Sequence, residues 1–322
     1  MVRSPFPYSD TDKRYHTYDY YLRHTYGSKC ARIPLDGGFS CPNRERGGRG
    51  CTYCSSRGSG DFCADLPTPR EQFMREYARL SEKWGKRLPA IPYFQAFSST
   101  YADVSVLRAC YEDIFSYTDE TGAPVPLAAL CIATRPDCLP DETVSYLAEL
   151  NGRIPVTVEL GLQSAHDVTL RRINRGHDLA CFDDAFDRLR AAGISVCVHI
   201  IDGLPGEDDA MMLATASYLG GKQPDFVKIH MLHLLRDTVM AEEYTEKPFP
   251  LLSRDDYISV VCRQLTRLPE KTVICRLTGD GARDQLIAPL WTVDKKSVLG
   301  GIDRYMKEHG LFQGCALQPD DR

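Results

Sequence analysis

The sequence from Leu127 to Leu160 reads LAALCIATRPDCLPDETVSYLAELNGRIPVTVEL and contains one complete strand–helix–strand unit. The apolar runs at 127–133 and 155–160 have the length and composition of buried strands. Between them, residues 141–150 have the apolar spacing of a helix. Two neighbouring strands that are joined through a helix run parallel, so this stretch predicts an α/β fold.

The same alternation continues on both sides of this unit. Apolar runs predict six strands, at 31–35, 91–97, 127–133, 155–160, 194–201 and 226–230. Helical spacing predicts helices between them, at 70–86, 104–117, 141–150, 178–192 and 208–219. We expect one main domain at 30–235, an N-terminal extension at 1–29 and a C-terminal extension at 236–322. The C-terminal extension should contain a helix (254–268), a strand (272–277) and a further helix (295–309).

The composition excludes several classes of protein. The chain has 322 residues, 43% of them hydrophobic, and a net charge of −5, as in an ordinary globular protein rather than a general nucleic-acid binder. No apolar signal segment follows Met1, and the longest uncharged stretch, 88–102, is too short and polar to span a bilayer. We therefore expect a cytoplasmic protein without membrane contact. The 13 cysteines are odd in number, which argues against a disulfide framework.

Three of these cysteines form a group that packing does not explain. Cys41, Cys51 and Cys54 have the spacing C-x9-C-x2-C and lie in a glycine-rich segment directly after the first predicted strand. Three thiolates suit an iron–sulfur cluster that keeps one iron open, whereas structural zinc prefers four ligands, for which Cys63 is available. The spacing alone leaves both possibilities open. The position favours an active site, because α/β folds place such sites at the carboxyl ends of their strands.

Motifs along most of the chain, taken in order, resemble the radical S-adenosylmethionine (SAM) superfamily. Within it, the chain is similar to the branch containing the catalytic subunit of Elongator, and most of all to the YhcC/YtqA-like family of bacterial proteins, which lack Elongator's acetyltransferase domain. The segments that carry this resemblance are LDGGFSCPNR (35–44), YFQAFSSTYA (93–102), TRPD (134–137), ELGLQS (159–164), RGH (175–177), HIIDGLPGE (199–207), VKIH (227–230), RLTGD (276–280) and QG (313–314). The superfamily's commonest first spacing is C-x3-C, and the longer gap here is shared with the Elongator-like branch.

The resemblance implies a fold, two cofactors and a reaction class. The fold would be an incomplete parallel (β/α)6 TIM-like barrel with N- and C-terminal additions. Cys41, Cys51 and Cys54 would hold three irons of a [4Fe–4S] cluster, and SAM would chelate the fourth. Reductive cleavage of SAM would then give a 5′-deoxyadenosyl radical that abstracts hydrogen from a substrate. Such an enzyme needs an electron donor such as flavodoxin or ferredoxin.

The resemblance also implies which residues bind SAM. For several of these residues, a purely structural role is the alternative. Ser98 and Ser99 would contact its methionyl part, or would simply form a polar turn. Glu159 would accept hydrogen bonds from SAM, or would be buried in a pair with an arginine. Gln163 and Arg175 match the ribose-contacting Gln and carboxylate-facing Arg of the similar coproporphyrinogen-oxidising enzymes. His199 would contact the ribose, or would be an ordinary core residue.

Lys228 and His230 are the candidates for the substrate side. They alternate with Val227 and Ile229 on the last predicted strand, so both lie on one face of the sheet. If that face lines the barrel, we expect both side chains to contact a polar, anionic group of the substrate. Arg135, at the end of the third strand, is likewise a candidate for contact with the substrate if its side chain lines the barrel.

Two other functions stay open at this stage. One is an RNA-modifying enzyme, for which Lys13-Arg14 with Arg44, Arg46 and Arg49 could form a basic patch. The other is a zinc- or iron-binding scaffold without catalysis. The sequence does not identify the substrate, which is either a small molecule or RNA.

Overall fold

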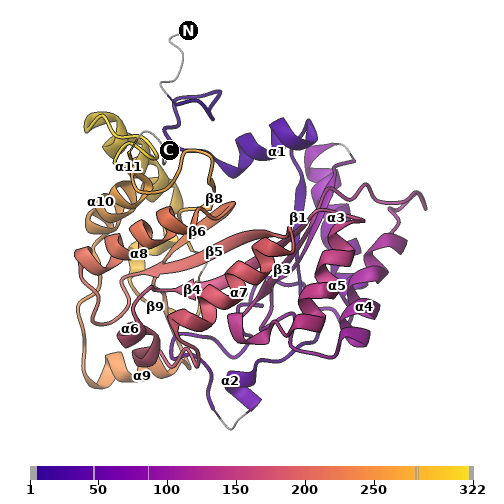
Figure 1. Cartoon of the computed structure of the whole chain (residues 1–322), viewed down its shortest axis with the longest axis horizontal. Coiled ribbons are helices and arrows are strands. Elements are labelled where there is room, and N and C mark those ends of the chain that lie inside the picture. The colour runs from indigo at the N-terminus through magenta and orange to yellow at the C-terminus, as the bar shows by residue number, and fades with distance from the viewer. Residues whose placement is uncertain (1–5, 46–47, 86, 280, 282, 319–322) are drawn as a thin grey trace.

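A curled sheet of seven parallel strands forms the centre of the molecule (Figure 1). The computed structural model describes residues 6–45, 48–85, 87–279, 281 and 283–318. The strands lie in the order β1(Ala31–Leu35), β2(Ala90–Phe94), β3(Leu130–Thr134), β4(Val156–Gln163), β5(Ser195–Asp202), β6(Phe226–Met231) and β8(Val273–Arg276). This arrangement confirms the expected incomplete α/β barrel.

The number of strands differs from the expected six. The seventh strand, β8, was predicted as part of the C-terminal extension, and it pairs in parallel with β6. An uncovered β6 would expose a row of unpaired backbone N–H and C=O groups, and β8 satisfies them. The last strand of the expected barrel is therefore an inner strand of the sheet.

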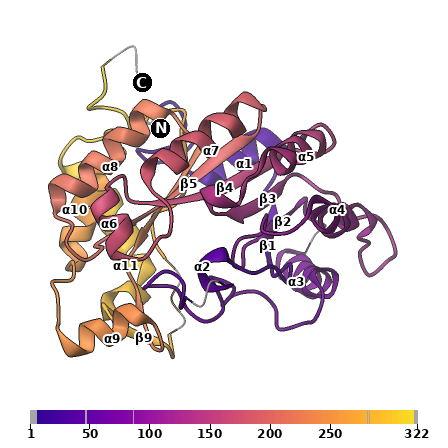
Figure 2. The same cartoon turned by 60° about the horizontal axis from the view of Figure 1, so that its bottom comes forward.

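Helices cover the outer, convex face of this sheet (Figure 2). They are α3(Pro69–Trp84), α4(Val104–Glu112), α5(Asp141–Asn151), α7(Leu179–Ala191), α8(Asp209–Lys222) and α10(Arg254–Leu265). All six lie where helical spacing predicts a helix. The start of α3 shows why: Thr68 caps the backbone N–H of Glu71, the Glu71 side chain accepts from the backbone of Thr68, and Pro69 occupies the first turn.

The remaining helices, a pair of short strands and three 3₁₀ turns complete the fold. They are α1(Tyr18–Tyr26), α2(Pro42–Glu45), α6(Asp167–Arg172), α9(Val239–Glu246), α11(Lys295–Glu308), the antiparallel pair β7(Leu234–Leu235) and β9(Leu286–Ala288), and the 3₁₀ turns η1(Asp113–Ser116), η2(Pro136–Cys138) and η3(Leu290–Val293). In Figure 1, α1 lies at one end of the sheet, while α2, α9 and β9 lie at the other.

The two faces of the strands have different chemistry. On β6, Val227 and Ile229 are fully buried in the main hydrophobic core under the helices. Lys228 lies between these two residues and His230 follows them, and both line a cavity on the concave side. Because side chains alternate along a strand, an apolar outer face leaves the other positions to line the barrel interior, which we call the lumen.

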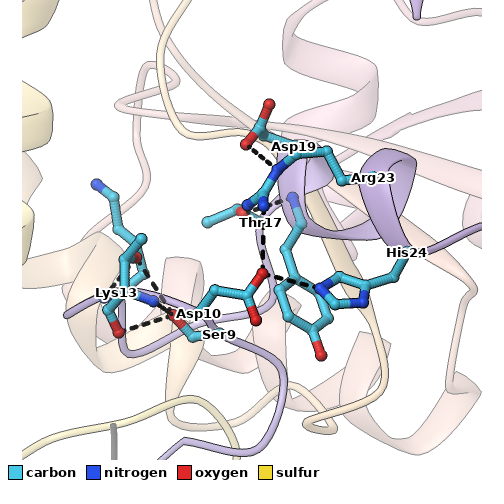
Figure 3. Close-up of polar contacts among 9 residues, drawn as sticks. Ser9, Asp10, Lys13, Thr17, Asp19, Arg23 and His24 are labelled. Atoms are coloured by element: carbon cyan, nitrogen blue, oxygen red, sulfur yellow. Dashed lines mark hydrogen bonds and ion pairs between the residues drawn. The ribbon is translucent and has the colours of Figure 1, made fainter. Parts of the chain in front are cut away.

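The N-terminal segment closes one end of the lumen against β8. Thr17 forms a parallel bridge with Ile274, whose N–H donates to the carbonyl of His16 at 2.7 Å. Asp10 accepts hydrogen bonds from Arg23 (3.2 Å) and His24 (2.8 Å), which fixes the preceding loop on α1 (Figure 3). The residues before α1 therefore complete the edge of the sheet.

Gln313 connects this N-terminal segment to the C-terminal part of the chain. Its Oε1 accepts from the N–H of His16 at 2.9 Å, and its Nε2 donates to the carbonyls of Pro269 (2.6 Å) and Thr272 (2.8 Å). The Gln313 side chain is fully buried. One amide thus joins the beginning of the chain to both ends of the turn before β8.

Candidate active site

The lumen contains a cavity of about 580 Å³ that reaches from the cysteine loop to the side chains of α1. Ten of the eleven predicted site residues line it: Cys41, Cys51, Cys54, Ser98, Glu159, Gln163, Arg175, His199, Lys228 and His230. They come from β4, β5, β6 and the loops after β1, β2 and α6. The fold therefore brings together residues that are up to about two hundred positions apart in the sequence.

Ser99 is the exception. Its Oγ donates to the carbonyl of Ala96 at 3.2 Å, its N–H donates to Ala133, and its side chain is fully buried. Ser98 lines the cavity, whereas Ser99 is not among its lining residues. The predicted contact of Ser99 with the methionyl part of SAM stays a prediction.

The cysteine loop is held in place by two asparagines. Asn43 Nδ2 donates to the carbonyl of Asn174 at 2.6 Å, and Asn174 Nδ2 donates to the carbonyl of Gly50 at 2.8 Å. Gly176 allows this contact, because a Cβ there would lie 2.8 Å from Asn43 Oδ1. The loop after β1 is therefore locked to the loop after α6, which also carries Arg175.

Two arginines face the buried thiol of Cys51. Arg175 Nη1 lies 3.5 Å from Cys51 Sγ and Arg135 Nη1 lies 4.0 Å from it. Burial by itself raises the pKa of the Cys51 thiol, but Arg175 and Arg135 outweigh it, and the pKa is lowered. A thiolate is the form that binds metal, so this environment prepares Cys51 as a ligand.

The three loop thiols are not gathered into a compact set of metal donors in this structure. Within the described residues, the metal-type donor atoms that all lie within 4.8 Å of one another belong to Glu159, Cys197 and His199. Tetrahedral zinc with Zn–S bonds of about 2.3 Å would place its sulfurs about 3.8 Å apart. The described part of the loop therefore contains no preformed zinc site of three thiols.

Among the buried polar atoms around this loop that have no hydrogen-bond partner in the described part of the chain, two belong to residues that line the cavity. They are Ser98 Oγ and Arg175 Nε. Buried polar groups normally have partners, and an orphaned pair beside a cavity indicates a ligand position. The donor set consists of three thiols, a hydroxyl and a guanidinium, and it suits an iron–sulfur cluster together with SAM.

The end of β4 is distorted where it meets this position. The pairing register with β5 shifts between Gly161 and Gln163, and Gln163 has a positive φ of 76°. The carbonyl of Gly161 accepts from Arg175 Nη2 at 2.7 Å. Non-glycine residues with positive φ are costly and often occur at functional sites, and here the distortion turns the Gln163 side chain toward the cavity.

Glu159 is the centre of a buried charge cluster deeper in the lumen. Its Oε1 accepts from Arg32, its Oε2 accepts from Lys228, and His199 Nε2 lies 2.9 Å from the same Oε2. Burial alone would raise the pKa of Glu159, but Arg32 and Lys228 hold it well below its ordinary value. Of the two predicted roles of Glu159, the structure displays the buried ion pair, while contact with SAM stays a prediction.

Lys228 and His230 both point into the lumen. Lys228 Nζ lies 3.4 Å from the hydroxyl of Tyr93 and 4.6 Å from the centre of its ring. His230 Nε2 is buried and has no hydrogen-bond partner among the described residues, and its ring lies 5.6 Å from that of His199. The predicted contact of both residues with a substrate stays a prediction.

Sequence reasoning missed Arg32, Tyr93 and Arg276 as residues of the lumen. Each lies on a short strand that reads as an apolar run, and each now lines the cavity. The signal for Arg32 was its alternation with the buried Ala31 and Ile33 on β1. Its partner could not be inferred, because Glu159 is 127 positions away in the sequence.

The comparisons with known proteins agree with this geometry. The Radical SAM superfamily matches residues 41–219, and the Radical_SAM C-terminal domain matches residues 224–308. The uncharacterized protein YtqA of Bacillus subtilis is 46% identical over 99% of this chain and 97% of its own length. Protein YhcC of Escherichia coli K12 is 38% identical over 92% of this chain and 93% of its own.

A solved structure supports the fold. The archaeal Methanocaldococcus infernus Elp3, with an N-terminal deletion, superposes with a TM-score of 0.68 at 18% identity, covering 88% of this chain and 64% of that one. In the part of the chain that the structure describes, no helix is both long enough and apolar enough to cross a membrane. On the superfamily match and the similarity to YtqA, this chain belongs to the radical SAM superfamily, whose enzymes use a [4Fe–4S] cluster and S-adenosylmethionine.

Proposed function

We propose that this enzyme cleaves SAM reductively and directs the resulting 5′-deoxyadenosyl radical at a substrate in the lumen. The observation that supports it most is the cavity itself, which three cysteines, the orphaned Ser98 Oγ and the orphaned Arg175 Nε share. When bound, the cluster and SAM would supply a one-electron cleavage of the sulfonium bond, with the electron coming from a reductant such as flavodoxin or ferredoxin.

The chain's own residues would position the cofactors. Cys41, Cys51 and Cys54 would ligate three irons, and Arg175 would pair with the carboxylate of SAM. A guanidinium suits that contact because it presents two parallel N–H donors to a carboxylate. Arg175 is held for this task by Gly161, and Ser98 offers a hydroxyl at the neighbouring loop.

An RNA substrate receives little support from the predicted basic patch. Arg49 forms two hydrogen bonds with Glu242 (2.6 and 2.7 Å), Arg44 donates to the carbonyl of Cys54, and Lys13 pairs with Asp303. Arg46 lies outside the described residues. These cations serve contacts within the protein, so we favour a small-molecule substrate and treat RNA as an outcome of the experiment below.

The test is anaerobic reconstitution with iron and sulfide, followed by addition of dithionite and SAM. We expect 5′-deoxyadenosine and methionine by mass spectrometry, with larger amounts when the substrate is present in a cell metabolite extract. Stimulation by purified tRNA instead of the extract would contradict a small-molecule substrate.

The cysteines are tested in the same experiment. The triple variant C41A/C51A/C54A should lose the iron–sulfur absorbance and all SAM cleavage but remain folded, because the three thiols lie outside the main core. Cys63→Ala is the matched control and should keep both. Near-normal iron in the triple variant, or loss of iron with Cys63→Ala, would show that the metal site has been assigned to the wrong ligands.

A further inference from the structure

Exposed apolar side chains gather at one place on the surface. Six large hydrophobic side chains are exposed in the described part of the chain, and three of them lie here: Phe62 (46% exposed), Leu290 (69%) and Val293 (38%). Phe62 and Val293 line a pocket of about 540 Å³, and Leu290 begins the turn η3 that carries Val293. We call this pocket, with the adjacent turn η3, the outer pocket. Exposed apolar side chains that form a patch, rather than being scattered singly, indicate an interaction site.

The outer pocket lies next to the cavity that contains the three loop cysteines. Phe62 and His233 line both of them. The imidazole of His233 is packed closely against Gly279 and Gly281, where an added Cβ would lie 2.4 Å and 2.6 Å from its ring. At Phe62 and His233, a single layer of side chains therefore separates the outer pocket from the cavity.

The loop that carries Cys54 also carries Phe62. Ser55 Oγ, next to Cys54, donates to Asp61 Oδ2, next to Phe62, at 3.0 Å. This hydrogen bond closes the loop, so the exposed ring and the predicted cluster ligand are neighbours of the two bonded residues. Leu286 of β9 also lines the outer pocket, and β9 lies at the same end of the barrel as α2 (Figure 1). A protein that covers Phe62 would thus approach Cys54 closely.

The described charged residues of the outer pocket are mainly basic. They are Arg283, Lys295 and Lys296, with Asp294 as the acidic one. Asp294 caps helix α11, where its Oδ1 accepts from the N–H of Ser297 at 3.0 Å. The whole chain has the opposite sign, with a net charge of −5. A surface that combines exposed apolar side chains with cations is complementary to a partner that has an apolar contact area and acidic residues around it.

Two other occupants fit this surface less well. A second copy of this chain would bring the same cations face to face, and like charges oppose such a contact. RNA would be attracted by the cations, but proteins bind single-stranded RNA largely by stacking its bases on aromatic rings. Leu290 and Val293 are aliphatic and offer no such platform. The apolar part of the surface therefore favours a protein.

We propose that the outer pocket is the docking surface for the protein that reduces the cluster, a small acidic flavoprotein of the flavodoxin type. The exposed apolar edge of its flavin would contact Leu290 and Val293, and its acidic residues would face Lys296. The donor loses one electron and the cluster gains it, and no bond forms or breaks. This inference rests on the proposed function, because reductive cleavage of SAM is what requires the electron. Contacts between electron-transfer proteins are typically small, as this surface is.

Binding of oxidised flavodoxin to the reconstituted enzyme, measured by calorimetry at low ionic strength, tests the apolar part of the surface. The double variant L290S/V293S should weaken binding by about tenfold or more, because two apolar side chains of the contact are lost. V106S/V168S is the matched control, since it removes two exposed valines that do not line the outer pocket. It should leave flavodoxin binding unchanged.

Lys296→Glu tests the charge. It should weaken flavodoxin binding by about threefold or more and reduce the dependence of binding on salt. The new glutamate would lie in the first turn of α11, where the helix dipole favours an acidic residue, so the helix should stay folded. Arg304→Glu changes an exposed arginine further along the same helix and should leave binding unchanged.

The rate of cluster reduction separates docking from chemistry. Reduced flavodoxin should reduce the cluster more slowly in L290S/V293S and in Lys296→Glu, whereas dithionite, which needs no docking surface, should act equally on all variants. Equal flavodoxin binding in L290S/V293S and V106S/V168S would overturn the proposal. So would tRNA binding, ferredoxin binding in place of flavodoxin binding, or self-association of the wild type, if L290S/V293S weakens it.

SAM cleavage with dithionite is assayed in parallel. If flavodoxin binds as predicted but dithionite gives no cleavage, the proposed function is overturned. If dithionite gives cleavage but flavodoxin does not bind, this inference alone is overturned.

Discussion

Asp202, at the end of β5, is a buried carboxyl that the cofactor chemistry does not use. Its Oδ1 accepts from Gln264 Nε2 at 2.8 Å, while its Oδ2 and Gln264 Oε1 have no hydrogen-bond partner in the described structure. Burial raises the pKa of Asp202 to about 8, with smaller contributions from Glu207 and Asp209 and against the Gln264 hydrogen bond. The side chain is therefore protonated at neutral pH. The carboxyl proton on Oδ2 can then be donated to an acceptor such as Gln264 Oε1, so that neither oxygen is left without a hydrogen bond.

Asp202→Asn should stabilise the protein increasingly as the pH rises. The folded-state pKa is raised, so the stabilisation from the protonated acid is complete below about pH 4 and is lost as the pH rises through about 8. The asparagine keeps the hydrogen bond to Gln264 and has no proton to lose. Relative to wild type, it should gain about 1.4 kcal/mol per pH unit over this window.

Urea unfolding of both proteins across the window measures this difference. Asp255→Asn, an exposed residue in the first turn of α10, is the control and should give a difference that does not grow with pH. Parallel stability curves for wild type and Asp202→Asn would show that Asp202 is ionised in the folded protein.

The distorted end of β4 determines how Arg175 and Gln163 reach the cavity. A Cβ on Gly161 would lie 2.6 Å from Arg175 Nη2 and 2.7 Å from Gln163 Nε2. Both atoms are the far ends of flexible side chains, so they would move while the strand itself stayed in place. The glycine therefore matters for the position of these side chains more than for the stability of the sheet.

Gly161→Ala should raise the dissociation constant of SAM about tenfold or more and leave the iron content unchanged. The physical reason is the loss of one correctly placed charge-assisted contact from Arg175. Calorimetry on the reconstituted protein measures it. Gly221→Ala in α8 is the matched control, since no atom lies within 4 Å of the added Cβ. Unchanged SAM affinity in Gly161→Ala would mean that Arg175 and Gln163 do not bind SAM.

Elements with a clear period could be predicted from the sequence, and elements made by tertiary contacts could not. The strand and helix of each barrel unit follow from apolar runs and helical spacing, as at α5 and β4. Helix α1 (YDYYLRHTY) has Leu22 as its buried residue, and Tyr21 packs against Phe226 on β6, with ring centres 5.1 Å apart. No periodicity in the N-terminal segment could reveal that partner.

The site shows the same division. The spacing of the three cysteines and the alternation of Lys228 with Val227 were visible in the sequence, and both groups lie in one cavity. A buried pair between Glu159 and an arginine was one predicted alternative, but the identity of the partners was not visible, because Arg32 and Lys228 reach Glu159 from strands 127 and 69 positions away. Charge balance in the lumen depends on how the curled sheet brings these strands together, so it could only be read from the structure.

Considered as a whole, the molecule depends on contacts between residues far apart in the chain, and Gln313 makes three of them. Gln313→Ala should lower the free energy of unfolding by about 2–4 kcal/mol, because it leaves the N–H of His16 and the carbonyls of Pro269 and Thr272 buried without partners. Urea unfolding measures the loss. Gln285→Ala, whose side chain bonds an exposed neighbour, should change stability by less than about 0.5 kcal/mol.

Gln313 does not line the cavity, so iron content and SAM cleavage per folded molecule should equal those of wild type. A stability loss as small as that of Gln285→Ala would show that water replaces the three hydrogen bonds. A selective loss of activity would instead connect the closed end of the lumen to the chemistry.

The bond between His16 and Gln313 also governs how the protein is made. The two residues are 297 positions apart, and a ribosome adding about 5–20 residues per second needs about 15–60 s to travel between them. During that interval the N-terminal segment has no Gln313 to dock on, and the lumen stays open at that end. Each newly made molecule therefore passes through a period in which the cysteine loop exists while the barrel around it is unfinished. The docking of Gln313 ends that period, because it joins the N-terminal segment to the turn before β8.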